Sequence, residues 1–315
     1  MKLHLRQLVA VAALSGASLA QAATDRTPAI DGVVAADTPI EFIKDGFEGT
    51  EGPIALSDGS LLFTETRANR ITKIAVDGTT STFLDNTNGS NALAFNGERE
   101  LISVQTVKPQ VGVIWPADRV RVLAADFEGA PLLRPNDLVV DKTGGVYFSD
   151  PGVAPKPGEP QPVKSLYYVS AAGKLTRLAT DIDRPNGVQL SPDEKTLYVA
   201  NTSGEFLLAY DIVKPGQLGQ RRDFAKLAGY RQTDNGWASG ADGLAVDAKG
   251  RVYVATNVGI EVFSAKGQAL GIVELPKQPQ NIAFAGPGKH TLYAVGRGAA
   301  YRIKTLTAGY AGRAK

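Results

Sequence analysis

The chain has 315 residues, a formal net charge of +2 and no cysteine. The lack of cysteine excludes disulfides, thiolate catalysis and cysteine-based zinc sites. The chain holds two histidines, His4 and His290. Too few histidines are present for a histidine-rich zinc site, and a Ser-His-Asp triad would have to use His290, which lies in an expected turn. Any metal site in this sequence is therefore built from oxygen ligands.

The first 22 residues have the features of a secretory signal peptide. Lys2 and Arg6 form a basic start, residues 8–19 form an apolar stretch too short to span a bilayer, and residues 20–22 form a small-x-small cleavage site. The alternative is an amphipathic helix that stays attached. We expect cleavage after residue 22 and a periplasmic or secreted protein. Cleavage leaves 32 basic and 32 acidic residues, and this balance argues against nucleic acid and membrane as partners.

From residue 51 onward, one short pattern occurs six times. Each copy has a polar residue, an apolar run, a turn and a second apolar run. We call the first polar residue of each copy its opener. Successive openers lie 39 to 56 residues apart, about 46 on average, which is the period of propeller-type repeats. The openers are Glu51, Asn91, Asn136, Asn186, Asp242 and Asn281.

The first copy shows what one repeat contains. Residues 54–56 and 61–64 are apolar strands joined by the hairpin signal Asp58-Gly59, and residues 71–76 and 80–84 are two further strands. Four antiparallel strands with tight turns make one propeller blade. The sequence therefore predicts an all-β fold, a six-bladed β-propeller of four-stranded blades.

The last repeat supplies only three strands. Residues 39–44 alternate between apolar and polar side chains, although they precede the first repeat. We expect residues 39–44 to be the missing outer strand, which closes the ring and leaves no free edge between the first and last blades. The predicted organisation is a signal peptide (1–22), a polar leader (23–38), the propeller (39–305) and a tail (306–315).

Two long insertions interrupt the repeats. Residues 151–165 carry five prolines and follow a second strand, so they emerge on the face of the openers as a lid or a wall. Residues 215–240 place Trp237 just before Asp242. Ordinary loops between strands are the alternative for both insertions.

Propeller geometry brings the openers together. The first strands line the channel and run the same way, so the openers form an inner ring at one mouth, and the ends of the second strands, such as Gln105 and Asp150, form an outer ring. One Asn or Asp before a strand is an ordinary turn residue, but six in register indicate a site. Carboxylate and amide oxygens suit a hard divalent cation, calcium above all. Without a cation, Glu51 and Asp242 would repel each other.

The residues around four openers resemble the motifs of the senescence-marker-protein/gluconolactonase/luciferin-regenerating-enzyme family. The resemblance covers about residues 40–304 and implies a six-bladed propeller with one catalytic divalent metal and, in several members, hydrolysis of sugar lactones. The segments that carry it are Glu51-Gly52-Pro53, Arg134-Pro135-Asn136-Asp137, Arg184-Pro185-Asn186-Gly187 and Ala241-Asp242-Gly243-Leu244. Residues 259–263 and 279–281 are similar to its bacterial gluconolactonase branch.

The resemblance also implies roles for single residues. Glu51, Asn186 and Asp242 would be metal ligands, Asn136 a ligand or a neighbour of the metal, and Arg134 would face the substrate. The metal would be Ca²⁺, with Mg²⁺, Mn²⁺ and Zn²⁺ as alternatives. The second repeat departs from the family at Asn91 and Gln105, so its side of the pocket is expected to differ. The predicted substrate contacts are Arg134, Asn136, Asn91, Gln105, Asp150 and Trp237.

The predicted reaction is hydrolysis of an aldonolactone such as gluconolactone. The cation polarises the lactone, a water attacks the carbonyl carbon, and Asp242 is the general base because carboxylate is the only type of base at this mouth. Activation of the water by the metal alone is an open variant. Two other readings remain. One is a phosphotriesterase-like hydrolase with the same ligands, and the other is a non-catalytic periplasmic propeller that binds a ligand or a protein and holds a structural metal.

Overall fold

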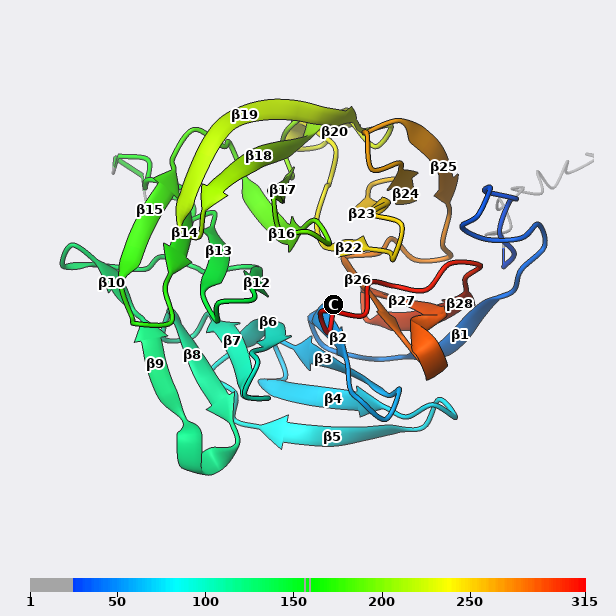
Figure 1. The fold of residues 1–315 in the computed structure, drawn as a ribbon, viewed down its shortest axis with the longest axis horizontal. Helices are drawn as coiled ribbons and strands as arrows, with labels where there is room; N and C mark the ends of the chain where they lie inside the picture. Colours follow the sequence, from blue (N-terminus) through cyan, green and yellow to red (C-terminus); the bar gives the residue numbers. More distant parts are fainter. Residues whose placement is uncertain (1–24, 156, 159) are drawn as a thin grey trace, which may run out of the picture.

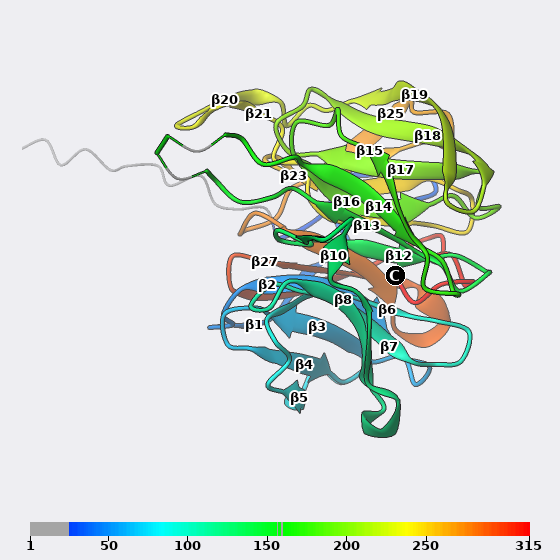
Figure 2. The same cartoon turned by 90° about the vertical axis from the view of Figure 1, so that its left-hand side faces the viewer.

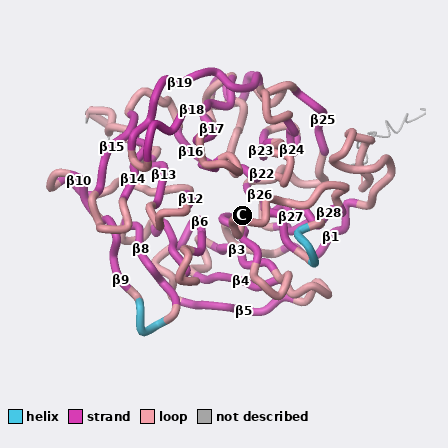
Figure 3. Tube along the Cα trace, viewed as in Figure 1, coloured by secondary structure: helices cyan, strands magenta, loops and turns pink. Residues whose placement is uncertain are grey.

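The computed structural model describes residues 25–155, 157–158 and 160–315. Within these residues, six four-stranded antiparallel sheets stand as blades around a central channel (Figure 1), which confirms the predicted six-bladed propeller. Figure 3 shows how little helix accompanies the strands: the described chain has two short 3-10 helices, η1 (Ala117–Arg119) and η2 (Pro287–Lys289). The predicted signal peptide, residues 1–22, lies outside the described residues.

Each of the first three blades runs outward from the channel in chain order. Blade one consists of β2 (Thr50–Ala55), β3 (Leu61–Glu65), β4 (Arg70–Ile74) and β5 (Thr80–Asp85). Blade two consists of β6 (Ser90–Phe95), β7 (Leu101–Gln105), β8 (Gln110–Trp115) and β9 (Arg121–Ala124). Blade three consists of β12 (Leu138–Val140), β13 (Val146–Asp150), β14 (Ser165–Val169) and β15 (Leu175–Ala179).

Blades four and five repeat this order, and blade six combines the two ends of the propeller. Blade four consists of β16 (Pro185–Leu190), β17 (Thr196–Asn201), β18 (Phe206–Lys214) and β19 (Gln217–Lys226). Blade five consists of β22 (Leu244–Val246), β23 (Val252–Thr256), β24 (Gly259–Phe263) and β25 (Ala269–Val273). Blade six consists of β26 (Asn281–Ala285), β27 (Thr291–Gly296), β28 (Ala299–Lys304) and β1 (Ile40–Asp45).

The predicted closing strand is confirmed. β1 pairs antiparallel with β28, in a register that places Ile40 opposite Ile303 and Glu41 opposite Arg302. Glu41 and Arg302 also form an ion pair at 2.7 Å across this seam. Because blade six takes its outer strand from the beginning of the chain, the first and last repeats cannot separate without breaking a sheet.

The turns inside the blades explain why the repeats fold as hairpins. Asp58 accepts a hydrogen bond from the backbone N–H of Ser60 at 2.9 Å, and Gly59 adopts a φ of 85°, which favours glycine. Asp77, Asp141 and Asp247 likewise accept a hydrogen bond from the backbone N–H two residues later. These side chains replace a missing backbone partner and fix the turn.

The leader packs on the propeller. Ile30, Val33 and Val34 are buried in an apolar cluster with residues of blades five and six. The Arg251 guanidinium donates to the backbone oxygens of Asp31 and Gly32 at 3.2 and 2.7 Å. The predicted polar leader is thus part of the folded body from residue 25 onward. No helix in the described ranges is long and apolar enough to cross a bilayer.

Two small hairpins stand outside the blades. They are β10 (Asp126–Phe127) with β11 (Ala130–Pro131), and β20 (Arg231–Thr233) with β21 (Gly236–Ala238). Figure 2 shows that the β20–β21 hairpin and the loop between β13 and β14 project from the same side of the propeller. The two predicted insertions therefore flank one face.

Candidate functional site

The openers lie where the innermost strands begin, at irregular points of the sheets. Asn136 and Asp242 precede β12 and β22, and Asn281 begins β26. In blades one, two and four the opener falls within the strand, beside a register shift between Glu51 and Ile54, between Ser90 and Ala92, and between Pro185 and Val188. Such bulges re-aim side chains. The sequence pattern places every opener just before its strand and does not predict these bulges.

Hydroxyl groups tie neighbouring blades together at this mouth. In three blades a Ser or Thr at or just after the end of the second strand donates to a backbone oxygen at the next opener. The contacts are Thr64 to Asn91 O at 2.9 Å, Ser149 to Asn186 O at 2.6 Å and Thr202 to Ala241 O at 2.8 Å. In these three blades the backbone at the opener is therefore held by the preceding blade, which fixes this part of the ring before any ligand binds.

The Asn186 side chain presents an oxygen without a partner. Its Nδ2 donates to the Thr202 hydroxyl at 3.0 Å. That hydroxyl uses its single proton on the Ala241 backbone oxygen, so it can only accept from Asn186, and the orientation of the amide is fixed. Among the described residues, the buried Asn186 Oδ1 has no hydrogen-bond partner.

Asp242 presents a second such oxygen. Its backbone N–H donates to Ala255 O at 2.9 Å, whereas its buried Oδ1 finds no partner in the described part of the chain. A buried oxygen without a donor is costly. Burial and the nearby Glu51 carboxylate both raise the pKa of Asp242 well above its ordinary value.

Glu51 is buried and held by blade six. Its Oε2 accepts from Asn281 Nδ2 at 3.1 Å, and its Oε1 from Gln280 Nε2 at 3.4 Å. Asn281 Oδ1 accepts from the Ile282 N–H at 3.0 Å, so the Asn281 amide nitrogen must face Glu51. Burial raises the pKa of Glu51 to about 7, the Asn281 hydrogen bond opposes this shift, and repulsion by Asp137 adds to it. Asn281 therefore orients Glu51.

Asn91, the second opener, contacts the third opener, Asn136. Its Nδ2 donates to the backbone oxygen of Asn136 at 2.8 Å, and its Oδ1 lies 3.5 Å from the Thr66 hydroxyl. The Asn136 N–H donates to Ser149 O at 2.8 Å. The structure thus gives Asn91 a contact that positions Asn136. Whether Asn91 and Asn136 also contact substrate stays a prediction.

Gln105 and Asp150 are buried and engaged within the chain. Gln105 Oε1 accepts from Asn88 at 2.8 Å and also from Gln110. Asp150 accepts the N–H groups of Leu133, Arg134 and Gly152, at 2.7, 2.8 and 3.1 Å, and burial raises its pKa. Asp150 therefore fixes the loop that presents Arg134, whose own side chain is exposed. Direct contact of these residues with substrate stays a prediction.

Trp237 lies outside the ring, on the β20–β21 hairpin. It is 58% exposed, and its ring lies 5.3 Å from that of Tyr230. The hairpin stands on the same side as the β13–β14 loop (Figure 2). Trp237 is therefore available to a ligand only at the rim of this face, and its predicted contact with substrate also stays a prediction.

The sequence pattern does not single out Asp137, a third acid in the channel. Asp137 is 1% exposed and raises the pKa of both Glu51 and Asp242 by repulsion. Asp137 immediately follows the opener Asn136, and the sequence shows it only as the last residue of a family motif. Burial beside Glu51 and Asp242 marks Asp137 as part of the site, and this burial is visible only in the folded ring.

Gly187 allows the fourth and fifth blades to meet at the site. A Cβ at this position would lie 2.1 Å from the Asp242 backbone oxygen, so the blades would have to move apart. We expect Gly187→Ala to destabilise the protein by about 2 kcal/mol or more, measured by urea unfolding. The matched control is Gly97→Ala, where a Cβ meets nothing within 4 Å. Equal stabilities of the two variants would contradict this packing.

The donor set fits a divalent cation. Among the residues that the structure describes, no three His, Cys, Asp or Glu side chains are grouped as a metal site. The openers Glu51 and Asp242 instead place two carboxylates close enough to repel each other. Within the described residues, Asn186 and Asp242 each carry a buried oxygen without a donor. Hard cations satisfy such oxygens and remove the repulsion between acids.

A cavity of about 900 Å³ lies elsewhere, at the other mouth of the channel. It is lined by the hairpin turns and by residues 310–314, and none of the predicted metal ligands lines it. His290, an exposed residue, follows one of these turns. We place the functional site at the openers, because the unpartnered oxygens and raised pKa values are there.

Comparison with known proteins agrees with the propeller fold and identifies the family. Residues 49–296 match the SMP-30/Gluconolactonase/LRE-like region. A gluconolactonase of Zymomonas mobilis is 30% identical, covering 91% of this chain and 86% of the relative. Gluconolactonase XC5397 of Xanthomonas campestris superposes with a TM-score of 0.77 at 25% identity, over 90% and 95% of the chains. Calcium-binding regucalcin of Agrobacterium tumefaciens has a TM-score of 0.69 at 20% identity, over 85% and 95%. The chain therefore belongs to the SMP-30/gluconolactonase/LRE-like family.

Proposed function

We propose that the protein is a divalent-metal-dependent enzyme that opens sugar lactones, with gluconolactone as the model substrate. The enzyme class rests on the gluconolactonase relatives. The cation site rests on one observation: in the part of the chain that the structure describes, Asn186 and Asp242 each present a buried oxygen without a donor, and a second acid lies beside Asp242. We propose Glu51, Asn136, Asn186 and Asp242 as the ligands and Ca²⁺ as the cation, because all four donors are oxygens.

A bound cation would supply Lewis-acid polarisation of the lactone carbonyl. The chain supplies the remaining functions. Asn281 and Thr202 hold Glu51 and Asn186 in place. Arg134, on the loop that Asp150 fixes, binds the hydroxyls of the sugar and the carboxylate that forms.

Asp242 is the proposed general base. Burial raises the pKa of Asp242, and a higher pKa makes a carboxylate a stronger base. As Asp242 accepts a proton from water, the water oxygen forms a bond to the carbonyl carbon. The bond from that carbon to the ring oxygen then breaks, and the ring oxygen receives the proton. The product is the open hydroxy acid, with no other reactant consumed.

Restoration of activity by metals tests this proposal. Chelator-treated protein should hydrolyse gluconolactone only after Ca²⁺, Mg²⁺, Mn²⁺ or Zn²⁺ is added back. Hydrolysis of a phosphotriester alone would favour the alternative hydrolase. Cation binding without hydrolysis of any lactone would favour the non-catalytic propeller. Full lactonase activity in the stripped protein would contradict the role of the metal.

Thr202→Val should weaken cation binding about tenfold or more, because the Asn186 amide loses the acceptor that orients it. Loss of groups that orient metal ligands has effects of this size. Calorimetric titration of the stripped protein measures the change. Thr79→Val is the control, because its hydroxyl serves only an exposed turn at Asp77. Unchanged affinity in Thr202→Val would contradict the proposed orientation of Asn186.

We also propose that the mature protein begins after residue 22 and acts in the periplasm or outside the cell. The support is the basic, apolar and small-residue pattern of residues 2–22. Mass spectrometry of the protein recovered from a periplasmic extract tests this, and an intact residue 1 in that fraction would contradict cleavage.

A further inference from the structure

Residues 309–315, which we call the tail segment, enter the channel from the mouth opposite the openers. Gly309 forms an isolated antiparallel bridge with Asp247, and the Tyr310 N–H donates to Val246 O at 3.0 Å. The Ala55 N–H donates to Ala314 O at 2.8 Å. Since Val246 and Ala55 end innermost strands, the tail segment crosses from blade five to blade one inside the ring, as Figure 1 shows.

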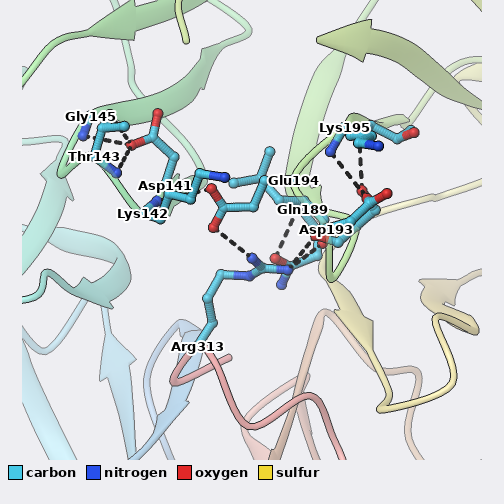
Figure 4. A network of polar contacts seen from close by, with 12 residues as sticks. Asp141, Lys142, Thr143, Gly145, Gln189, Asp193, Glu194, Lys195 and Arg313 are labelled. Atoms are coloured by element: carbon cyan, nitrogen blue, oxygen red, sulfur yellow. Dashed lines mark hydrogen bonds and ion pairs between the residues drawn. The ribbon is translucent and has the colours of Figure 1, made fainter. Parts of the chain in front are cut away.

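Two cationic side chains fasten the tail segment. Arg313 donates to the backbone oxygens of Leu190 and Ser191 at 2.6 and 2.9 Å and pairs with Glu194 at 3.2 Å (Figure 4). Lys289 donates to Tyr310 O at 2.9 Å and also to Arg313 O. The tail segment is therefore bound by blades four and six as well, and its path is a built part of the fold.

The tail segment delivers an ammonium group to the third acid of the channel. Lys315 Nζ lies 2.9 and 2.6 Å from the two carboxylate oxygens of Asp137, and these side chains are only 5% and 1% exposed. Asp137 also accepts from the Leu138 and Val188 N–H groups, at 2.8 and 3.4 Å. The Lys315–Asp137 pair is therefore buried directly beside the opener Asn136.

The charge of this pair reaches the openers. Asp137 follows Asn136 in the chain and accepts from the N–H of Val188, two residues after Asn186, so the pair lies between two of the proposed ligands. In the pair, Lys315 compensates the charge of Asp137. Loss of Lys315 would leave Asp137 as a third acid without its cation, next to the two acids of the proposed ligand set. In oxygen-ligand sites the number of charges tunes cation affinity.

We propose that the tail segment is a plug that sets the cation affinity of the site, with Lys315 as a positioning and charge-compensating residue that neutralises Asp137. The proposal rests on the proposed cation site. In the absence of Lys315, Asp137 acts as an additional anion beside the ligands. The site then binds divalent cations more tightly, in the range of a three-carboxylate site.

Calorimetric titration of chelator-stripped protein with CaCl₂ tests the proposal, at pH 8 and constant salt. K315M should bind Ca²⁺ about tenfold more tightly and D137N about tenfold more weakly, because buried charges interact strongly. D137N/K315M should return to within about threefold of the original protein, because the two effects cancel. K266M, at an exposed turn, is the control and should bind as the unmodified protein does.

K315M and D137N are expected to change Ca²⁺ affinity in opposite directions, which distinguishes a charge effect from a loss of folding. In thermal unfolding without metal, each single variant should melt several degrees lower, because it leaves one buried charge unpaired, and the double variant should recover. If K315M does not fold, the double variant should still bind about tenfold more tightly than D137N. Equal or weaker Ca²⁺ binding on loss of Lys315, in a protein whose unmodified form binds Ca²⁺, overturns this proposal alone. An unmodified protein that binds none of Ca²⁺, Mg²⁺, Mn²⁺ or Zn²⁺ overturns the cation site and the proposal with it.

Discussion

Asp242→Asn should lower kcat/KM for gluconolactone by about a thousandfold or more. The substitution removes one of the two carboxylates of the ligand set and the proposed general base together. Loss of a general base alone typically reduces the rate by about 10² to 10⁴. The unpartnered Oδ1 of Asp242 is the structural reason to expect a large effect, because it is aimed at no group of the chain that the structure describes. Steady-state kinetics with saturating metal measures the loss.

Two further measurements show which role of Asp242 dominates. If Asp242→Asn still binds the cation and loses kcat with KM unchanged, its carboxylate acts mainly as the base. If cation affinity falls in parallel, its role as a ligand dominates. Asp118→Asn, at an exposed position in η1, is the control and should retain full activity. An active Asp242→Asn enzyme would remove this residue from the mechanism.

The metal-free protein should lose stability as the pH rises from about 4.5 to about 7. The pKa of Glu51 is raised from 4.5 to about 7 in the folded state, so within this window the folded protein holds a proton that the unfolded chain has released. Stability therefore falls with increasing pH, by about 3 kcal/mol across the window. The pKa of Asp242 is shifted in the same direction.

Urea unfolding in EDTA at pH 5, 6, 7 and 8 measures this decline. Carboxylates with a lowered pKa act in the opposite direction. One of them, Glu100, has a pKa lowered to about 2, so its stabilising contribution is fully present from pH 5 upward and does not change between pH 5 and pH 8. Glu51→Gln should flatten the profile, and added Ca²⁺ should remove the decline, because the cation stabilises the ionised acids. A stability that rises from pH 5 to pH 7 in EDTA would contradict the assignment of Glu51.

Much of the fold could be predicted from the sequence because short local patterns specify the strands and turns of each repeat. Hairpin turns such as Asp58-Gly59 are specified by neighbouring residues, and the six copies of the repeat, counted from their openers, predict six blades. The closing strand was predictable because the last repeat lacks one strand and residues 39–44 have a strand pattern without a partner. The β1–β28 pair confirms that reasoning.

Only part of the candidate site could be predicted from the sequence. Its ring of oxygens follows from the repeat, since each opener occupies the same place in its blade. The bulges beside Glu51 and Asn186 depend on how blades pack, and no local pattern marks them. The tail segment has no periodicity, and Lys315 meets an acid 178 positions earlier in the chain. Such a contact depends on the closed ring and cannot be predicted from neighbouring residues.

Anomalous diffraction from crystals of the stripped protein soaked with Mn²⁺ tests the central claim most directly. We predict one strong peak at the mouth of the channel, about 2.0–2.6 Å from oxygens of Glu51, Asn136, Asn186 and Asp242. A peak confined to the opposite mouth, or no peak at the openers under conditions in which Mn²⁺ restores lactonase activity, would contradict the account.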